Sequence, residues 1–188
     1  RGIADPVLSL LLSILICTSL LFLILHDLYR TGAEPRRKAR NLCYRLQSRR
    51  WWPETLEEIS LIPEVQQLRA VVEIDAGPIF NLFQDPRPEV RTAAFLALNQ
   101  RVGWRSREAA AILSAAQATM ETPVRIAAVS TLGNVDEPAA IAGMTSFFRD
   151  PDPEVRRAAI RAALRDGGRK WAFVRDGVRL ALSDPKYS

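Results

Sequence analysis

The sequence predicts an all-α protein in which a single transmembrane helix precedes a short α-solenoid of helical hairpins. Three observations support this prediction. Residues 7–25 are free of charge, a proline–valine pattern recurs farther along at intervals near thirty residues, and the 188 residues are 48% hydrophobic but only 7% aromatic, with 12 prolines. A chain of this composition favours helices joined by turns over strands.

The uncharged run from Val7 to Leu25 is nineteen residues long. At the rise of an α-helix it covers about 28 Å, close to the thickness of the bilayer hydrocarbon core. We therefore expect a transmembrane helix over 7–29, preceded by an extracytoplasmic tail over 1–6. A cleaved signal peptide is the main alternative, but its basic residues would come before the apolar stretch. Here they follow it, so the positive-inside rule predicts a single-pass protein of the bacterial inner membrane with its N-terminus outside.

A basic amphipathic segment over 30–52 comes next, with a helix expected to begin at Pro35. Ala39, Leu42, Cys43 and Leu46 share one face of this helix. Two interpretations stay open: the helix lies among anionic lipid headgroups with tryptophans as anchors, or its apolar face caps the first repeat. The candidate membrane-interface residues are Arg36, Arg37, Lys38, Arg40, Trp51 and Trp52.

Helical hairpins are expected over 53–188. Each unit has a proline one or two residues before a valine, and the valines Val65, Val90, Val124 and Val155 are 25, 34 and 31 residues apart. An alanine pair follows each of the last three valines at the third and fourth positions. A period near thirty with a constant internal phase predicts a solenoid. Bulkier partner helices are expected over 78–83, 106–119, 136–149 and 170–183.

The best-formed unit begins at residue 150 and reads DPDPEVRRAAIRAAL. Asp152 suits the N-cap of its helix and Pro153 the first helical position. The motif D-P-x-P-E-V-R-x-A-A, present at 150–159 and at 85–94, resembles short bacterial HEAT repeats of the bilin-lyase type. The resemblance implies ion pairs that form a ladder between neighbouring repeats. The candidate ladder residues are Asp85, Arg91, Arg125, Asp150 and Arg156.

The two ends of the repeat domain depart from this motif. The unit around Val65 lacks both the arginine and the alanine pair, which suggests an atypical capping repeat. The bulky helix over 170–183 is followed by Asp184-Pro185 but by no further small-residue helix. We expect this last helix to dock on another protein. The candidate docking residues are Trp171, Val174, Val178 and Leu182.

The sequence offers few residues for catalysis. It has one histidine and two cysteines, without zinc-ligand spacing, a glycine-rich phosphate loop or a nucleophile that a histidine could reach. We therefore expect no enzyme, no metal and no cofactor. His26, at the end of the apolar run, is the one side chain suited to ligate a tetrapyrrole metal. Basic residues are interleaved with acidic ones, which favours a solvated face over nucleic-acid binding.

We interpret the chain as a membrane-anchored HEAT-repeat scaffold or accessory subunit of an integral membrane complex, for example an energy-transducing one. Its expected partners are integral membrane subunits and anionic lipid headgroups, not nucleic acid. Two alternatives stay open. The protein could handle a chromophore, as the bilin lyases do, or it could be an anchored signalling fragment.

Overall fold

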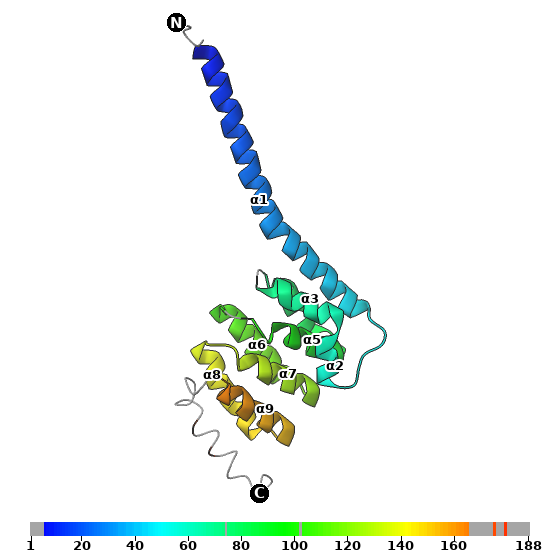
Figure 1. The fold of residues 1–188 in the computed structure, drawn as a ribbon. Helices are drawn as coiled ribbons and strands as arrows, with labels where there is room; N and C mark the ends of the chain where they lie inside the picture. The colour runs from blue at the N-terminus through cyan, green and yellow to red at the C-terminus, as the bar shows by residue number, and fades with distance from the viewer. Residues whose placement is uncertain (1–5, 74, 102, 166–174, 176–178, 180–188) are drawn as a thin grey trace.

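The computed structural model describes residues 6–73, 75–101, 103–165, 175 and 179. Across these residues every regular element is a helix (Figure 1). The elements are α1 (Pro6–Ser48), α2 (Leu56–Leu61), α3 (Pro63–Val72), α4 (Gly77–Phe80), the 3-10 helix η1 (Asn81–Gln84), α5 (Pro88–Leu98), α6 (Ser106–Ala118), α7 (Thr122–Leu132), α8 (Pro138–Met144), the 3-10 helix η2 (Thr145–Arg149) and α9 (Pro153–Leu164).

The longest helix, α1, has 43 residues and projects from the repeats (Figure 1). Its apolar run is open to solvent, with Leu15 63% and Phe22 69% exposed. This run is not a separate element, because α1 continues without a break through Pro35 and a series of charged residues to Ser48.

No helix in the described part of the chain has both the length and the apolar character needed to cross a bilayer. The predicted transmembrane helix over 7–29 is therefore wrong. The localisation inferred from it, a single-pass inner-membrane protein with its N-terminus outside, is wrong as well. The fold class is corrected accordingly, to an all-helical chain with helical repeats.

The C-terminal part of α1 belongs to the repeats. Ala39, Leu42, Cys43 and Leu46 are each at most 6% exposed, and α1 packs against α3 and α4. Of the two interpretations of this amphipathic segment, the structure shows the capping arrangement. The apolar face is covered by protein, and burial of each large aliphatic side chain contributes about 1.5–3 kcal/mol.

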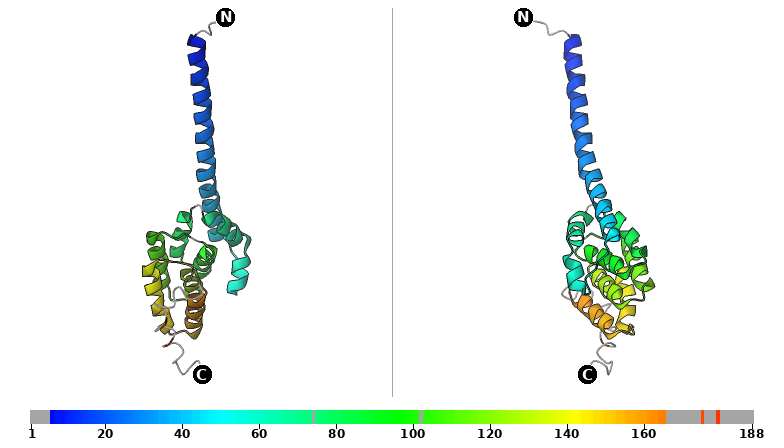
Figure 2. Two further views of the ribbon diagram at one scale, coloured as in Figure 1. Left: turned by 60° about the vertical axis from the view of Figure 1, so that its left-hand side comes forward. Right: turned by 90° about the vertical axis from the view of Figure 1, so that its right-hand side faces the viewer.

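The repeats form two layers of helices (Figures 1 and 2). The first, here called the small-residue layer, consists of α3, α5, α7 and α9, each packed against the next. The second contains the C-terminal part of α1, then α4 with η1, α6, and α8 with η2. One helix from each layer makes a hairpin. The short helix α2 is inserted between α1 and α3 and packs against α3 and α5.

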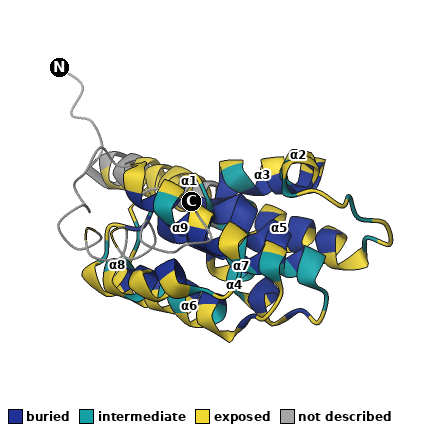
Figure 3. Ribbon diagram, turned by 90° about the horizontal axis from the view of Figure 1, so that it is seen from below, coloured by how far each residue is buried: buried dark blue, intermediate teal, exposed yellow. Residues whose placement is uncertain are grey.

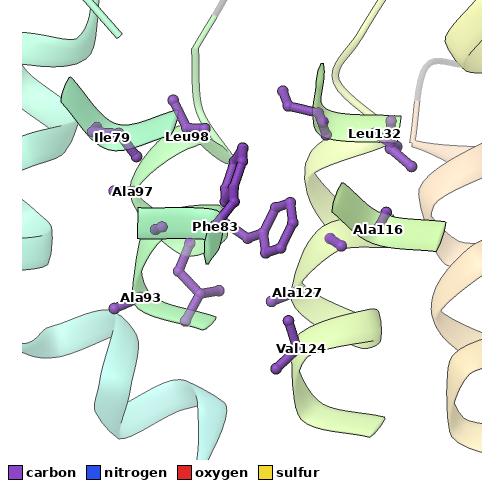
Figure 4. Packing of buried hydrophobic residues seen from close by; sticks show 14 of the residues in the cluster. Ile79, Phe83, Ala93, Ala97, Leu98, Ala116, Val124, Ala127 and Leu132 are labelled. Carbon is purple, nitrogen blue, oxygen red and sulfur yellow. The ribbon is translucent and has the colours of Figure 1, made fainter. Parts of the chain in front are cut away.

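The core lies between the layers, where the buried faces of α5 and α7 meet the second layer (Figure 3). The repeat valines Val65, Val90, Val124 and Val155 are all 0% exposed. Phe83 of η1 stacks on Phe95 of α5 with ring centroids 4.3 Å apart, in the cluster shown in Figure 4. The phase of the valines and alanine pairs in the sequence therefore marks the side of each helix that faces the core.

Gly133, at the C-cap of α7, lies close to Ala162 of α9. A Cβ at this position would lie 2.7 Å from Cβ and 3.0 Å from Cα of Ala162. We expect Gly133→Ala to lower the free energy of unfolding by about 1–3 kcal/mol, because two backbones would have to separate. Urea titration followed by circular dichroism measures the change.

Gly143→Ala in α8 is the matched control for this substitution. Its new methyl group would meet the flexible end of the Leu113 side chain, which can rotate away, and alanine favours the helix by up to about 1 kcal/mol. The expected loss is therefore smaller. A Gly143→Ala variant as unstable as Gly133→Ala would contradict the assignment of a backbone contact at Gly133.

Cysteine reactivity tests the docking of α1 on the repeats. Burial raises the pKa of Cys43 to about 12, and the thiolate is the reactive form. We expect iodoacetamide at pH 8 to alkylate the exposed Cys17 and to spare Cys43 until the protein is unfolded. Peptide mass spectrometry separates the two sites. Equal alkylation rates in the folded protein would show that α1 does not pack as described.

Candidate functional site

One edge of the small-residue layer carries arginines that join neighbouring repeats. Nη1 of Arg91 donates to the carbonyl oxygens of Asp85 at 2.7 Å and Pro86 at 3.1 Å. Nη2 of the same side chain pairs with Glu121 at 2.7 Å. The guanidinium group of Arg91 thus contacts both the turn before its own helix, α5, and the carboxylate that precedes the next repeat helix, α7.

The next repeat reproduces this arrangement. Arg125 donates to the carbonyl oxygen of Met120 and pairs with Asp150 through Nε at 3.2 Å. Arg156 donates to the carbonyl oxygens of Asp150 at 2.7 Å and Pro151 at 3.1 Å. The structure therefore brings Arg125 and Asp150 together as an ion pair across two repeats.

Asp85 does not form an ion pair with Arg91. Its carboxylate pairs with Arg87 at 3.0 Å and accepts a hydrogen bond from Gln47 of α1 at 3.2 Å. Burial alone would raise the pKa of Asp85, but hydrogen bonds from Arg87 and Gln47 outweigh it and lower the pKa. Asp85 consequently ties its repeat to α1, whereas Asp150 ties its repeat to α7.

Sequence reasoning missed Glu121 and Glu64 as members of the same edge. Glu121 takes the place of the aspartate in the third unit. Glu64 is 3.0 Å from Arg45 of α1 and 3.3 Å from Arg49, which directly follows α1. A signal for Glu121 was present, since it begins the shortened Glu121-Thr122-Pro123 start of that unit. Glu64 can reach Arg45 only because α3 packs against α1. The repeat motif does not predict this contact.

The opposite side of the small-residue layer forms a groove, here called the α2–α9 groove. It has a volume of about 370 Å³ and is open to solvent along one side. Its lining comes from every helix of the layer and from α2, and consists of Leu56, Glu57, Ser60, Arg69, Leu96, Asn99, Ile126, Ala127, Ser130, Ala158, Arg161 and Arg165.

A second set of polar contacts fixes one end of this groove. Asn134 donates to the side-chain oxygen of Asn99 at 2.9 Å, and Arg165 reaches Asn99 at 3.4 Å and Asn134 at 3.3 Å. These residues are 9, 10 and 10 positions after Val90, Val124 and Val155. The repeat phase could have identified them, because residues at equivalent positions of stacked repeats lie side by side.

The short helix α2 forms one wall of the groove and is firmly held. Thr55 and Glu58 make a capping box, with hydrogen bonds of 3.2 and 3.5 Å. Ile59 is only 3% exposed and anchors the helix in the core. Leu56 and Glu57 are left on the side that faces the groove.

The residues predicted for a membrane interface occupy different surroundings. The set Arg36, Arg37, Lys38 and Arg40 is exposed on α1, and Arg36 pairs with Asp75 at 3.2 Å. Trp51 is 69% exposed, whereas Trp52 packs against the core with the Arg49 guanidinium 5.9 Å from its ring centroid. The two tryptophans therefore differ in exposure, and only Trp51 has most of its side chain open to solvent.

The remaining candidates carry less structural information. His26 is exposed on α1, and its ring lies 6.2 Å from that of Phe22. Within the described ranges, no three His, Cys, Asp or Glu side chains are placed to hold a metal ion. The predicted docking residues Trp171, Val174, Val178 and Leu182 lie outside the described residues.

The ion pair between Arg91 and Glu121 predicts a pH dependence of stability. Hydrogen bonds from Arg91 and then Thr119 lower the pKa of Glu121 from 4.5 to about 2. The resulting stabilisation is complete above pH 4.5 and disappears as the pH falls through about 2. We expect Glu121→Gln to cost at most about 1 kcal/mol at pH 7, because the carboxylate is half exposed, and nothing near pH 2.

Glu54→Gln is the control for Glu121→Gln, since Glu54 is exposed and makes no ion pair with other described residues. Denaturant titrations of both variants between pH 2 and pH 7 measure the difference. Stability curves that coincide at every pH would exclude a stabilising role for the Arg91–Glu121 pair.

Comparison with known proteins supports the repeat assignment. Residues 109–167 match the family model for HEAT repeats, a stretch that includes α7, α8, α9 and nearly all of α6. HEAT repeats are typically non-catalytic scaffolds. No curated protein and no solved structure matches the chain, and the comparisons do not support the bilin-lyase type. The finding is thus a HEAT-repeat segment within an all-helical chain.

Proposed function

We propose that this protein is a helical-repeat scaffold that binds a partner protein through the α2–α9 groove. The observation that carries the proposal is the groove itself, which runs over all four helices of the small-residue layer. A solenoid presents an extended surface of this kind because each repeat adds one helix to the same face. The HEAT match over 109–167 supports this use of the surface.

The shape and lining of the groove favour a protein segment as ligand. Small-molecule sites are usually concave and bury most of the ligand, whereas this groove is open along one side. Its lining alternates apolar side chains, such as Leu96 and Ile126, with polar ones, such as Asn99 and Ser130. That mixture is typical of interfaces in which an apolar centre is bordered by hydrogen-bonding groups.

Site-specific photo-crosslinking tests the proposal. A photo-reactive amino acid at Ser130, in the groove, is expected to give a defined crosslinked partner in cells. The same amino acid at Gln117, exposed on α6 of the other layer, serves as the control and is expected to give at least five-fold less. The identified partner is then purified and its binding to the chain measured directly.

Ile126→Lys, in the partly exposed floor of the groove, is expected to weaken that binding at least ten-fold with an unchanged circular dichroism spectrum. Equal crosslinking from positions 117 and 130, or binding indifferent to Ile126→Lys, would place the partner elsewhere on the molecule.

A further inference from the structure

We infer that the α2–α9 groove binds an acidic amphipathic helix of the partner protein, docked beside α2. This inference rests on the proposed function and names the chemistry of its partner. Three properties of the groove support it: the charges in its lining, the apolar residues of its floor, and the helix that already occupies one end of the same surface.

The charges in the groove are predominantly positive. Arg69, Arg161 and Arg165 line it, and Glu57 on the α2 wall is the single carboxylate in the lining. Arg161 is exposed and has no carboxylate within ion-pair distance in the described part of the chain. Arg165 contacts the neutral amide oxygens of Asn99 and Asn134.

The opposite edge of the same layer shows a different pattern. There Arg91 and Arg125 each pair with a carboxylate of the next repeat, at 2.7 and 3.2 Å. Among the described residues, carboxylates therefore neutralise the arginines of one edge, but none pairs with Arg161 or Arg165 of the groove. Carboxylates of a partner would complement these cations and accelerate association.

The floor of the groove is apolar and partly made of small residues. Ile126 packs against the core while remaining half-buried, and Ala127 and Ala158 lie beside it. Ala127 and Ala158 are at most 3% exposed, so Ile126 is the side chain of this floor that can contact the apolar stripe of a docked helix. A ligand with carboxylates alone would leave this floor uncovered.

A helix of the chain itself, α2, already lies on the same surface. It reads LEEISL, carries Glu57 and Glu58 in its first turn, and buries Ile59. It packs against α3 and α5, at the end of the layer away from α9 (Figure 2). An acidic amphipathic helix therefore already lies on the first half of the layer, and the surface of α7 and α9 continues beyond it.

The same features do not favour nucleic acid. Single-stranded nucleic acids bind to proteins largely by stacking of bases on aromatic side chains, and the groove lining contains no aromatic residue. Glu57 would also repel a phosphate backbone along the α2 wall. Nucleic acid is therefore treated as a competing outcome of the experiment.

Three synthetic peptides of eighteen residues serve as probes in fluorescence anisotropy with the full chain. All share leucines at helical spacing, and their remaining positions are Glu in the first peptide, Gln in the second and Lys in the third. We expect saturable binding of the Glu peptide, at least ten-fold weaker binding of the Gln peptide and none of the Lys peptide. Affinity for the Glu peptide is expected to fall as salt rises.

Variants of the chain locate the binding site. Arg161→Glu with Arg165→Glu is expected to weaken binding of the Glu peptide at least ten-fold. Glu57→Gln is expected to strengthen it about two-fold by removing the repulsive carboxylate. Arg107→Glu with Arg149→Glu, at exposed positions away from the groove lining, makes the same change of net charge and is expected to alter affinity less than two-fold. Arg107→Glu alone is expected to have a still smaller effect.

Several results would overturn the inference. One is equal affinity of the chain for the three peptides. Another is a loss of affinity with the Arg107→Glu, Arg149→Glu control as large as that with Arg161→Glu and Arg165→Glu. A third is an RNA oligonucleotide that displaces the Glu peptide and binds more tightly. If the partner crosslinked at position 130 binds normally to the Arg161→Glu, Arg165→Glu variant, the scaffold function stands and the acidic ligand is excluded. If no partner crosslinks at position 130, the scaffold function itself fails.

Discussion

The forked contact of Arg91 and Arg125, which follow Val90 and Val124, is the interaction on which the stacking of the central repeats depends. Arg91 and Arg125 each contact two groups. One is a carbonyl oxygen in the turn before their own helix, and the other is the carboxylate that precedes the next repeat helix. The first contact fixes the entry of the chain into the helix, and the second fixes the distance to the neighbouring repeat. Charge-assisted hydrogen bonds of this kind are stronger and more directional than neutral ones. Burial of the apolar core supplies most of the driving force. Apolar contacts alone would allow one helix to slide against another, whereas the directional hydrogen bonds of a guanidinium group would not.

The repeat architecture could be predicted from the sequence because its signals are local and periodic. A valine and an alanine pair in constant phase mark the buried side of a helix wherever the unit occurs, and the structure places Val65, Val90, Val124 and Val155 in the core. The transmembrane prediction failed on a property that is not local. In the structure the run over 7–25 is the first part of a helix that continues through charged residues to Ser48.

The candidate site divides in the same way. Asn99, Asn134 and Arg165 lie 9, 10 and 10 residues after their repeat valines, so the period of the sequence places them close to one line, although they carry no motif of their own. The role of α2 could not be predicted, because a six-residue helix between two proline-containing turns gives no periodic signal and its place on α5 is a tertiary contact. Glu64 likewise has no place in the repeat motif, while the structure pairs it with Arg45 of α1 and with Arg49 just after α1. The repeat period predicts contacts between equivalent helices. It does not predict how α1 and α2, which are not repeats, pack against them.

The position of α2 has a consequence for competition. Because α2 is joined to the repeats through α1 on one side and α3 on the other, its effective concentration at the surface of α5 is of the order of millimolar or higher. A free ligand would need a correspondingly greater affinity to displace it. A ligand of the proposed kind would therefore bind more readily over α7 and α9, where no tethered segment competes among the described residues. By occupying α3 and α5, the helix α2 would thus determine which part of the helical layer is open to such a ligand.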